Sequence, residues 1–148
     1  MIERICQITL VICFSFQSVF TSEAAYVANS GVLKFEDTVI SIKSEMSGAL
    51  VLFTRVTNLS KEIQVVTEVT SPQFRKVEFH RMSMDNGTHS MHKIKQLKIE
   101  PGKSVTSSMG RFHIMLIEPL VLLEKDVDVN LEFKLSSGKT VHLNTHIR

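Results

Sequence analysis

The strongest constraint on the fold is a series of short strand-like segments, separated by turns, that begins near residue 25. No segment in this series keeps the 3.6-residue period of an amphipathic helix. The segment 111–117 is typical, because it is rich in the β-branched and aromatic residues that favour strands. Ten segments are predicted to be strands: residues 32–35, 38–43, 49–58, 62–70, 76–84, 88–96, 104–108, 112–117, 127–135 and 140–147.

Turn-forming residues lie between the segments, at positions 58–60, 71–72, 86–87, 101–102 and 137–138. Glycine, proline, asparagine and serine at such positions end strands and support tight turns. About eight to ten short strands at this spacing predict an all-β fold, a single antiparallel β-sandwich or barrel. A length of 148 residues and a hydrophobic share of 43% fit one domain with one core.

Residues 1–24 have the pattern of a secretory signal peptide. Arg4 gives a positive start, residues 5–22 contain no charge, and small residues precede a cleavage point after Ala24. An uncleaved membrane anchor is the alternative, but the segment is diluted by polar residues and short for a span of about 20 apolar residues. We therefore expect an exported domain of residues 25–148 that has no membrane span once the signal is removed.

Two histidines and two methionines recur at set intervals in the middle of the chain. Ten residues separate His80 from Met91, twenty-one separate Met91 from His113, and one separates His113 from Met115. Imidazole and thioether are neutral donors, and the soft thioether favours Cu(I) over zinc, calcium or magnesium. As a set of ligands, these four side chains predict a copper site.

Strand alternation is expected to place these side chains away from the core. His113 and Met115 are two residues apart and share one strand face, whereas Phe112 and Ile114 point to the opposite, core-facing side. By the same alternation, Val77 and Phe79 share one face, and Glu78 and His80 the other. The Asn86-Gly87 step predicts a hairpin that folds Met91 back toward His80.

Residue chemistry alone leaves another interpretation open. Methionines commonly fill cores, and surface histidines are commonly just solvated. Met84, His89 and His92 lie close to the four residues in the sequence, so a set of four could also be assembled by chance. We keep Met84 and His89 as possible additions to the site.

Both cysteines, Cys6 and Cys13, lie in the predicted signal, so the mature chain would contain none. A blue-copper electron carrier needs one cysteine thiolate and a CuA centre needs two, which excludes both kinds of protein. Cys13 follows the bulky Ile12, where a lipidation site requires a small residue, so no lipid anchor is expected. Methionine suits an oxidising compartment, because a thioether cannot form disulfides.

The spacing of His80, Met91, His113 and Met115 resembles the signature of the periplasmic copper chaperones of the PCu(A)C type, and all four positions match without a gap. The resemblance extends over residues 30–147. Segments 77–80 and 110–116 are similar to the family's two ligand strands, and 97–102 to the link between strands. It implies a cupredoxin-like β-sandwich that binds one copper ion, chiefly Cu(I), through these four residues.

The resemblance also implies a partner and a location. It implies a periplasmic monomer that delivers copper to the CuA centre in a subunit of a haem-copper oxidase, or to another copper chaperone. The net charge of +2 without a Lys/Arg cluster predicts no nucleic-acid partner. Scattered acidic residues without a Ser/His/Asp arrangement predict that the chain is not an enzyme. A copper-buffering or uptake protein with another client and a metal-free interaction module remain as alternatives.

Overall fold

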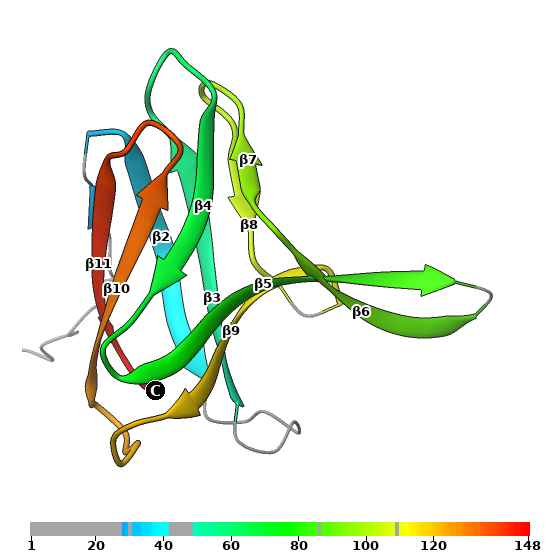
Figure 1. The fold of residues 1–148 in the computed structure, drawn as a ribbon, viewed down its shortest axis with the longest axis vertical. Coiled ribbons are helices and arrows are strands. Elements are labelled where there is room, and N and C mark those ends of the chain that lie inside the picture. The colour runs from blue at the N-terminus through cyan, green and yellow to red at the C-terminus, as the bar shows by residue number, and fades with distance from the viewer. Residues whose placement is uncertain (1–27, 30, 42–48, 86, 109) are drawn as a thin grey trace, which may run out of the picture.

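A computed structural model describes residues 28–29, 31–41, 49–85, 87–108 and 110–148. The predicted signal peptide, residues 1–24, and its cleavage point lie outside this part of the chain. The described residues form two antiparallel sheets that face each other as a β-sandwich (Figure 1), which confirms the predicted all-β class. None of these residues belongs to a helix long and apolar enough to cross a membrane.

The first sheet has the strand order β1-β2-β3-β9-β5-β6, and β8 pairs with β3 beside this path. Its strands are β1 (Ala28–Asn29), β2 (Leu33–Ser41), β3 (Ala49–Asn58), β5 (Phe74–Asp85), β6 (Thr88–Ile94), β8 (Ser104–Thr106) and β9 (Phe112–Pro119). The second sheet has the order β11-β10-β4-β7. It consists of β4 (Gln64–Thr70), β7 (Leu97–Ile99), β10 (Asp128–Leu135) and β11 (Thr140–His146).

The core lies between the two sheets and is made of the apolar residues on their facing sides. In β10 every second residue is buried, because strand side chains alternate between the two faces of a sheet. Phe133 of β10 meets Phe35 of β2 with ring centroids 4.7 Å apart, and both rings are fully buried. This aromatic pair therefore packs across the core and joins the two sheets.

The two strands predicted at 32–35 and 38–43 are one strand, β2, interrupted by a bulge. The register with β3 shifts between Glu36 and Val39, and Asp37 has a φ of 54° in the left-handed region. Aspartate tolerates this conformation better than most residues. The gap predicted between the two segments therefore corresponds to the bulge, and the strand continues beyond it. Residues 42–43 lie outside the described part of the chain.

The strand predicted at 88–96 ends earlier, and the chain then changes sheets. β6 stops at Ile94, and residues 97–99, expected to belong to a link, form β7 against β4 of the second sheet. Leu97 and Ile99 are buried there. The exposed residues Lys95 and Gln96 separate the two strands. Which sheet a strand joins depends on partners distant in the chain, so local pattern could not show that the chain crosses to the other sheet here.

The hairpin predicted from the Asn-Gly step is confirmed. β5 pairs with β6, the register closes at Asp85 opposite Thr88, and Gly87 has a φ of 80°. β9 pairs with β5 only as far as Arg81. Beyond that residue β5 and β6 continue as a two-stranded ribbon that projects from the sandwich (Figure 1).

Candidate metal centre

The two predicted histidine ligands face each other on adjacent strands. His80 of β5 is the direct cross-strand partner of His113 of β9. Their ring centroids are 6.1 Å apart. The next residue pair, Arg81 and Phe112, is the last at which β5 pairs with β9, so the two histidines lie at the base of the projecting hairpin. The fold thus brings together two imidazoles that are distant in the sequence.

The two predicted methionine ligands lie on either side of this histidine pair. Met115 is opposite Glu78 on β5, and Met91 of β6 is opposite Met82. Each methionine is therefore a diagonal cross-strand neighbour of His80. Such neighbours are about 7–8 Å apart, within reach of long side chains. By register, all four predicted residues lie on one face of three adjacent strands, with His80 in the middle.

Exposure differs across the four residues. His113 and Met115 on β9 are only 6% and 3% exposed, whereas His80 and Met91 are half-buried. Phe112 is buried in the core, as alternation along β9 predicted. A molecule that approaches this face therefore meets the β5 and β6 side chains before those of β9.

A carboxylate determines which nitrogen of His80 carries a proton. The Nε2 of His80 lies 3.0 Å from Oε2 of Glu78, and Nζ of Lys93 donates to Oε1 of the same carboxylate at 2.6 Å. An ionised carboxylate only accepts hydrogen bonds, so Nε2–H donates. In the neutral ring the lone pair is then on Nδ1, which is buried and has no hydrogen-bond partner among the described residues. Metal-bound histidines commonly have this carboxylate arrangement, so the residues fit a metal.

The surroundings keep Glu78 ionised and favour the neutral form of His113, and these are the protonation states that metal binding needs. Hydrogen bonds from Lys93 and then from His80 hold the pKa of Glu78 below its usual value, so this carboxylate stays ionised. Burial, followed by repulsion from His80, lowers the pKa of His113. Neutral imidazole is the metal-binding form, because a proton and a metal compete for the same lone pair.

The donor set limits the kind of metal that could bind here. Over the described ranges of the chain, no three His, Cys, Asp or Glu side chains gather into a possible metal site. At the histidine pair, the thioethers of Met91 and Met115 are the neighbouring donors that would bring the number of ligands to four. Thioether ligands select soft ions such as Cu(I).

The additional residues considered from the sequence lie further along the hairpin. Met84 is 65% exposed and pairs with His89 near the turn, four residues beyond His80 on the same strand. At about 3.3 Å per residue, this puts the Met84 backbone roughly 13 Å from that of His80. The His89 side chain lies outside the described part of the structure. Met82 is nearer, because it is the direct partner of Met91.

Sequence analysis did not single out Glu78 and Lys93 as parts of the site. A signal for Glu78 was present, because residues two apart on a strand share a face and Glu78 was placed beside His80 by that rule. Lys93 was not foreseeable, because its position opposite His80 depends on the register of the hairpin.

The lowered pKa of His113 predicts how stability depends on pH in the metal-free protein. The unfolded chain binds a proton at this residue at higher pH than the folded chain does. The contribution of neutral His113 is therefore complete above about pH 6.5 and is lost as the pH falls toward the lowered pKa of the folded protein. We expect the free energy of unfolding to fall between pH 7.5 and 5.5, and to fall less in a His113→Gln variant.

Urea unfolding at the two pH values measures this difference. His142→Gln is the matched control, because the His142 side chain is 71% exposed. The control should keep the pH dependence of the natural chain. Equal pH dependence in the His113→Gln variant and the natural chain would contradict the assignment.

Comparisons with known proteins identify the family and the fold of this chain. A family model described as "Putative lipoprotein LpqE-like" matches residues 33–147, which is most of the chain. No curated protein sequence gives a significant match. The copper-bound PCuAC domain of PmoF2 has a TM-score of 0.66 at 17% identity, covering 83% of this chain and 97% of that domain.

Two further solved structures have the same fold. The apo PCuAC domain of PmoF1 has a TM-score of 0.66 at 13% identity and covers 83% of this chain and 98% of that one. The Cu(I) form of DR1885 from Deinococcus radiodurans has a TM-score of 0.63 at 15% identity, covering 86% and 83%. At these identities the likeness shows the fold. The chain belongs to the LpqE-like family and has the PCuAC fold, as the resemblance of its sequence predicted.

Proposed function

We propose that this protein is an exported copper carrier that binds one Cu(I) through His80, Met91, His113 and Met115. We further propose that it delivers the ion to the CuA centre of a haem-copper oxidase. The names of two structural relatives support copper as the cargo, since one is a copper-bound domain and another a Cu(I) form. The family's description as lipoproteins supports an exported protein.

The observation that carries the proposal is the arrangement around His80. This residue is opposite His113 and diagonal to both methionines, and its buried Nδ1 has no hydrogen-bond partner in the described structure. A buried lone pair without a partner is costly unless something binds it. Cu(I) would satisfy it and be held by donors that match its softness.

The graded burial of the site suggests an order for copper release. Met91 is partly exposed and lies where the hairpin leaves the sandwich, whereas Met115 is buried on β9. A thiolate of an acceptor is a stronger soft ligand than a thioether and adds negative charge. We expect it to replace Met91 first, while His113 and Met115 hold the ion until the acceptor has more ligands in place.

Titration with Cu(I) against a competing chelator tests the binding, using protein purified after expression of the full chain. One tight equivalent is expected, and its absence would overturn the copper proposal. Mixing the loaded protein with a metal-free CuA domain tests delivery. Transfer should become faster as the acceptor concentration rises; a rate independent of that concentration would exclude direct ligand exchange. Transfer to a copper chaperone but not to the CuA domain would replace the proposed client.

Replacing Glu78 by glutamine is expected to weaken Cu(I) binding by about 10–100-fold, the usual cost of losing the group behind a metal-bound histidine. A glutamine amide can donate as well as accept, so it no longer requires the proton to be on Nε2 of His80. Chelator competition measures the affinity, and the ¹⁵N chemical shifts of the imidazole report the tautomer in the metal-free protein.

The matched control for this variant is Glu68→Gln, which removes a carboxylate paired at 2.7 Å with Lys134 on the other sheet. It should leave both the Cu(I) affinity and the His80 tautomer unchanged. If Glu78→Gln also leaves them unchanged, Glu78 does not position His80.

A further inference from the structure

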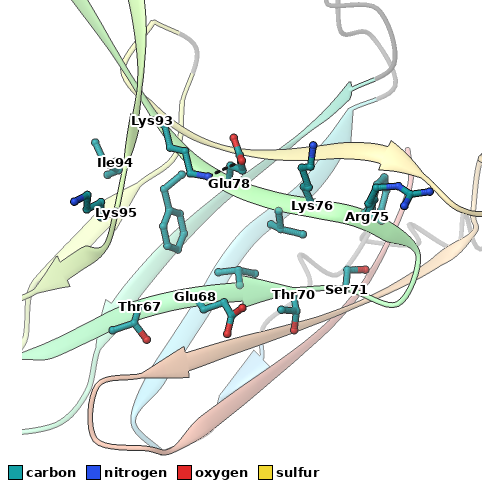
Figure 2. A pocket seen from close by; sticks show the side chains of 14 residues that line it. Thr67, Glu68, Thr70, Ser71, Arg75, Lys76, Glu78, Lys93, Ile94 and Lys95 are labelled. Carbon is teal, nitrogen blue, oxygen red and sulfur yellow. Dashed lines mark hydrogen bonds and ion pairs between the residues drawn. The ribbon is translucent and has the colours of Figure 1, made fainter.

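A groove lies between the two sheets on the side where the sandwich is open. Its walls are residues 67–70 of β4 and residues 74–78 of β5, and its volume is about 610 Å³. Figure 2 shows the two strands running along it and the turn after Ser71 closing one end. Residues 93–95, at the end of β6, line the groove near its other end.

Two strand edges border this groove without a partner strand in the described structure. β4 pairs with β10 on one edge, and with β7 on the other edge only over Gln64–Val66. β5 pairs with β9 on one edge, and with β6 on the other edge only from Phe79 onward. Residues 74–78 therefore present an open edge in line with β6. Open edges of this kind can bind an extended chain as an added strand.

The charge of the groove selects the kind of chain that fits. Four cations line it, Arg75, Lys76, Lys93 and Lys95, against two carboxylates, Glu68 and Glu78. Lys93 pairs with Glu78, and Arg75 and Lys76 pair with Glu118 outside the groove. Cations therefore outnumber carboxylates along the groove, and Lys95 has no ion pair among the described residues. A basic edge opposes pairing with a second copy of itself, because like charges would face each other. A strand with glutamate or aspartate side chains meets opposite charges instead.

The groove is also continuous with the candidate metal centre. Glu78 lines the groove and accepts the hydrogen bond from His80. Lys93 lines it as well and is the cross-strand partner of His80 on β6. A chain bound along residues 74–78 would therefore end beside the predicted copper ligands.

We propose that this groove binds an extended acidic segment of the protein that exchanges copper with this chain, and that the segment pairs with the open edge of β5 over residues 74–78. The identity of the docked protein as a copper partner rests on the proposed function, whereas the binding of an acidic strand does not. Apolar residues such as Val69 and Phe79 line the groove too, and they would contact the apolar side chains that alternate with the acidic ones.

A capped seven-residue peptide, Thr-Glu-Val-Glu-Val-Glu-Thr, is the probe, and the same peptide with lysine in place of glutamate is its control. Each is added to the ¹⁵N-labelled protein purified after expression of the full chain. The acidic peptide should shift the amide signals of residues 67–70 and 74–78 and slow hydrogen exchange at 74–78, and added salt should weaken its binding. No shift in these residues, or equal shifts with the basic peptide, would overturn the proposal.

Charge reversal separates the groove from the copper site. Arg75→Glu combined with Lys95→Glu should weaken peptide binding by about tenfold or more. The control, Lys61→Glu with Lys139→Glu, makes the same change in net charge at exposed positions that do not line the groove, and it should bind the peptide normally. Equal weakening in the two variants would mean non-specific attraction and would overturn the groove site.

Cu(I) titration of both variants keeps the two proposals apart. We expect each variant to retain one tight equivalent, because none of the four positions is a predicted ligand. Peptide binding without Cu(I) binding would overturn the copper function and leave the groove as a docking site for an acidic strand. Cu(I) binding without peptide binding would overturn the groove proposal alone.

Discussion

Replacing Met91 or Met115 by leucine is expected to lower the Cu(I) affinity by at least about 100-fold in each case, the upper end of what the loss of a group behind a ligand costs. Leucine has a similar volume and no sulfur, so the fold should tolerate it while the metal loses a donor. A remaining set of two histidines and one methionine is less soft and incomplete. Chelator competition with Cu(I) measures the loss, and circular dichroism confirms that each variant is folded.

The matched control is Met84→Leu, the same chemical change at an exposed residue further along the hairpin. Its affinity should equal that of the natural chain. A loss in Met84→Leu as large as that in Met91→Leu would mean that the ligand set is wrong. Unchanged affinity in both Met91→Leu and Met115→Leu would mean that neither methionine binds copper. It would favour the alternative interpretation of the sequence, in which the methionines are incidental.

Replacing Phe133 by alanine is expected to reduce the free energy of unfolding by about 3–5 kcal/mol. Its ring is fully buried and meets Phe35 across the sandwich at 4.7 Å, so the change leaves a cavity where the two sheets join. A domain of this kind has a total stability of about 5–15 kcal/mol, so the loss is a large fraction of it. Urea unfolding of the metal-free protein measures the effect.

Phe133→Leu keeps part of the side chain, so its free energy of unfolding should lie between those of the natural chain and Phe133→Ala. This second variant keeps the test usable if the alanine variant does not fold. Leu122→Ala is the surface control; its side chain is 79% exposed, and the change should alter stability by less than about 0.5 kcal/mol. If Phe133→Ala costs no more than this control, the aromatic pair does not join the sheets as described.

Much of the fold was predictable because it depends on local pattern. Alternation along residues 112–117 placed Phe112 and Ile114 in the core, and both are buried there. The Asn-Gly step predicted the hairpin that returns Met91 toward His80, and β5 does pair with β6, with Met91 opposite Met82. These features follow from the two-residue period of strands and from turn chemistry, which involve only neighbouring residues.

Other features depend on which strands become neighbours, and local pattern does not determine that. The merging of two predicted strands into β2 and the passage of the chain into β7 are examples. The open edge at residues 74–78 is another, because it exists only where β6 stops pairing with β5. In each case several strands compete for the same edges and the same core. The outcome therefore depends on the positions of all the strands together and not on one segment alone.

The same distinction between local pattern and strand pairing applies to the candidate site. The four donor types, their spacing and their expected position off the core-facing side could all be read from the sequence, and these properties predicted a soft metal. The pairing of β9 with β5 could not be read from the sequence, and it is this pairing that places His113 opposite His80. The contact by which Glu78 holds the proton on Nε2 of His80 likewise appears only in the folded chain. The folded chain also shows that Met115 is buried while Met91 is partly exposed. The physical reason is that a strand's own alternation sets which way a side chain points, whereas contact and burial depend on partners that are distant in the chain.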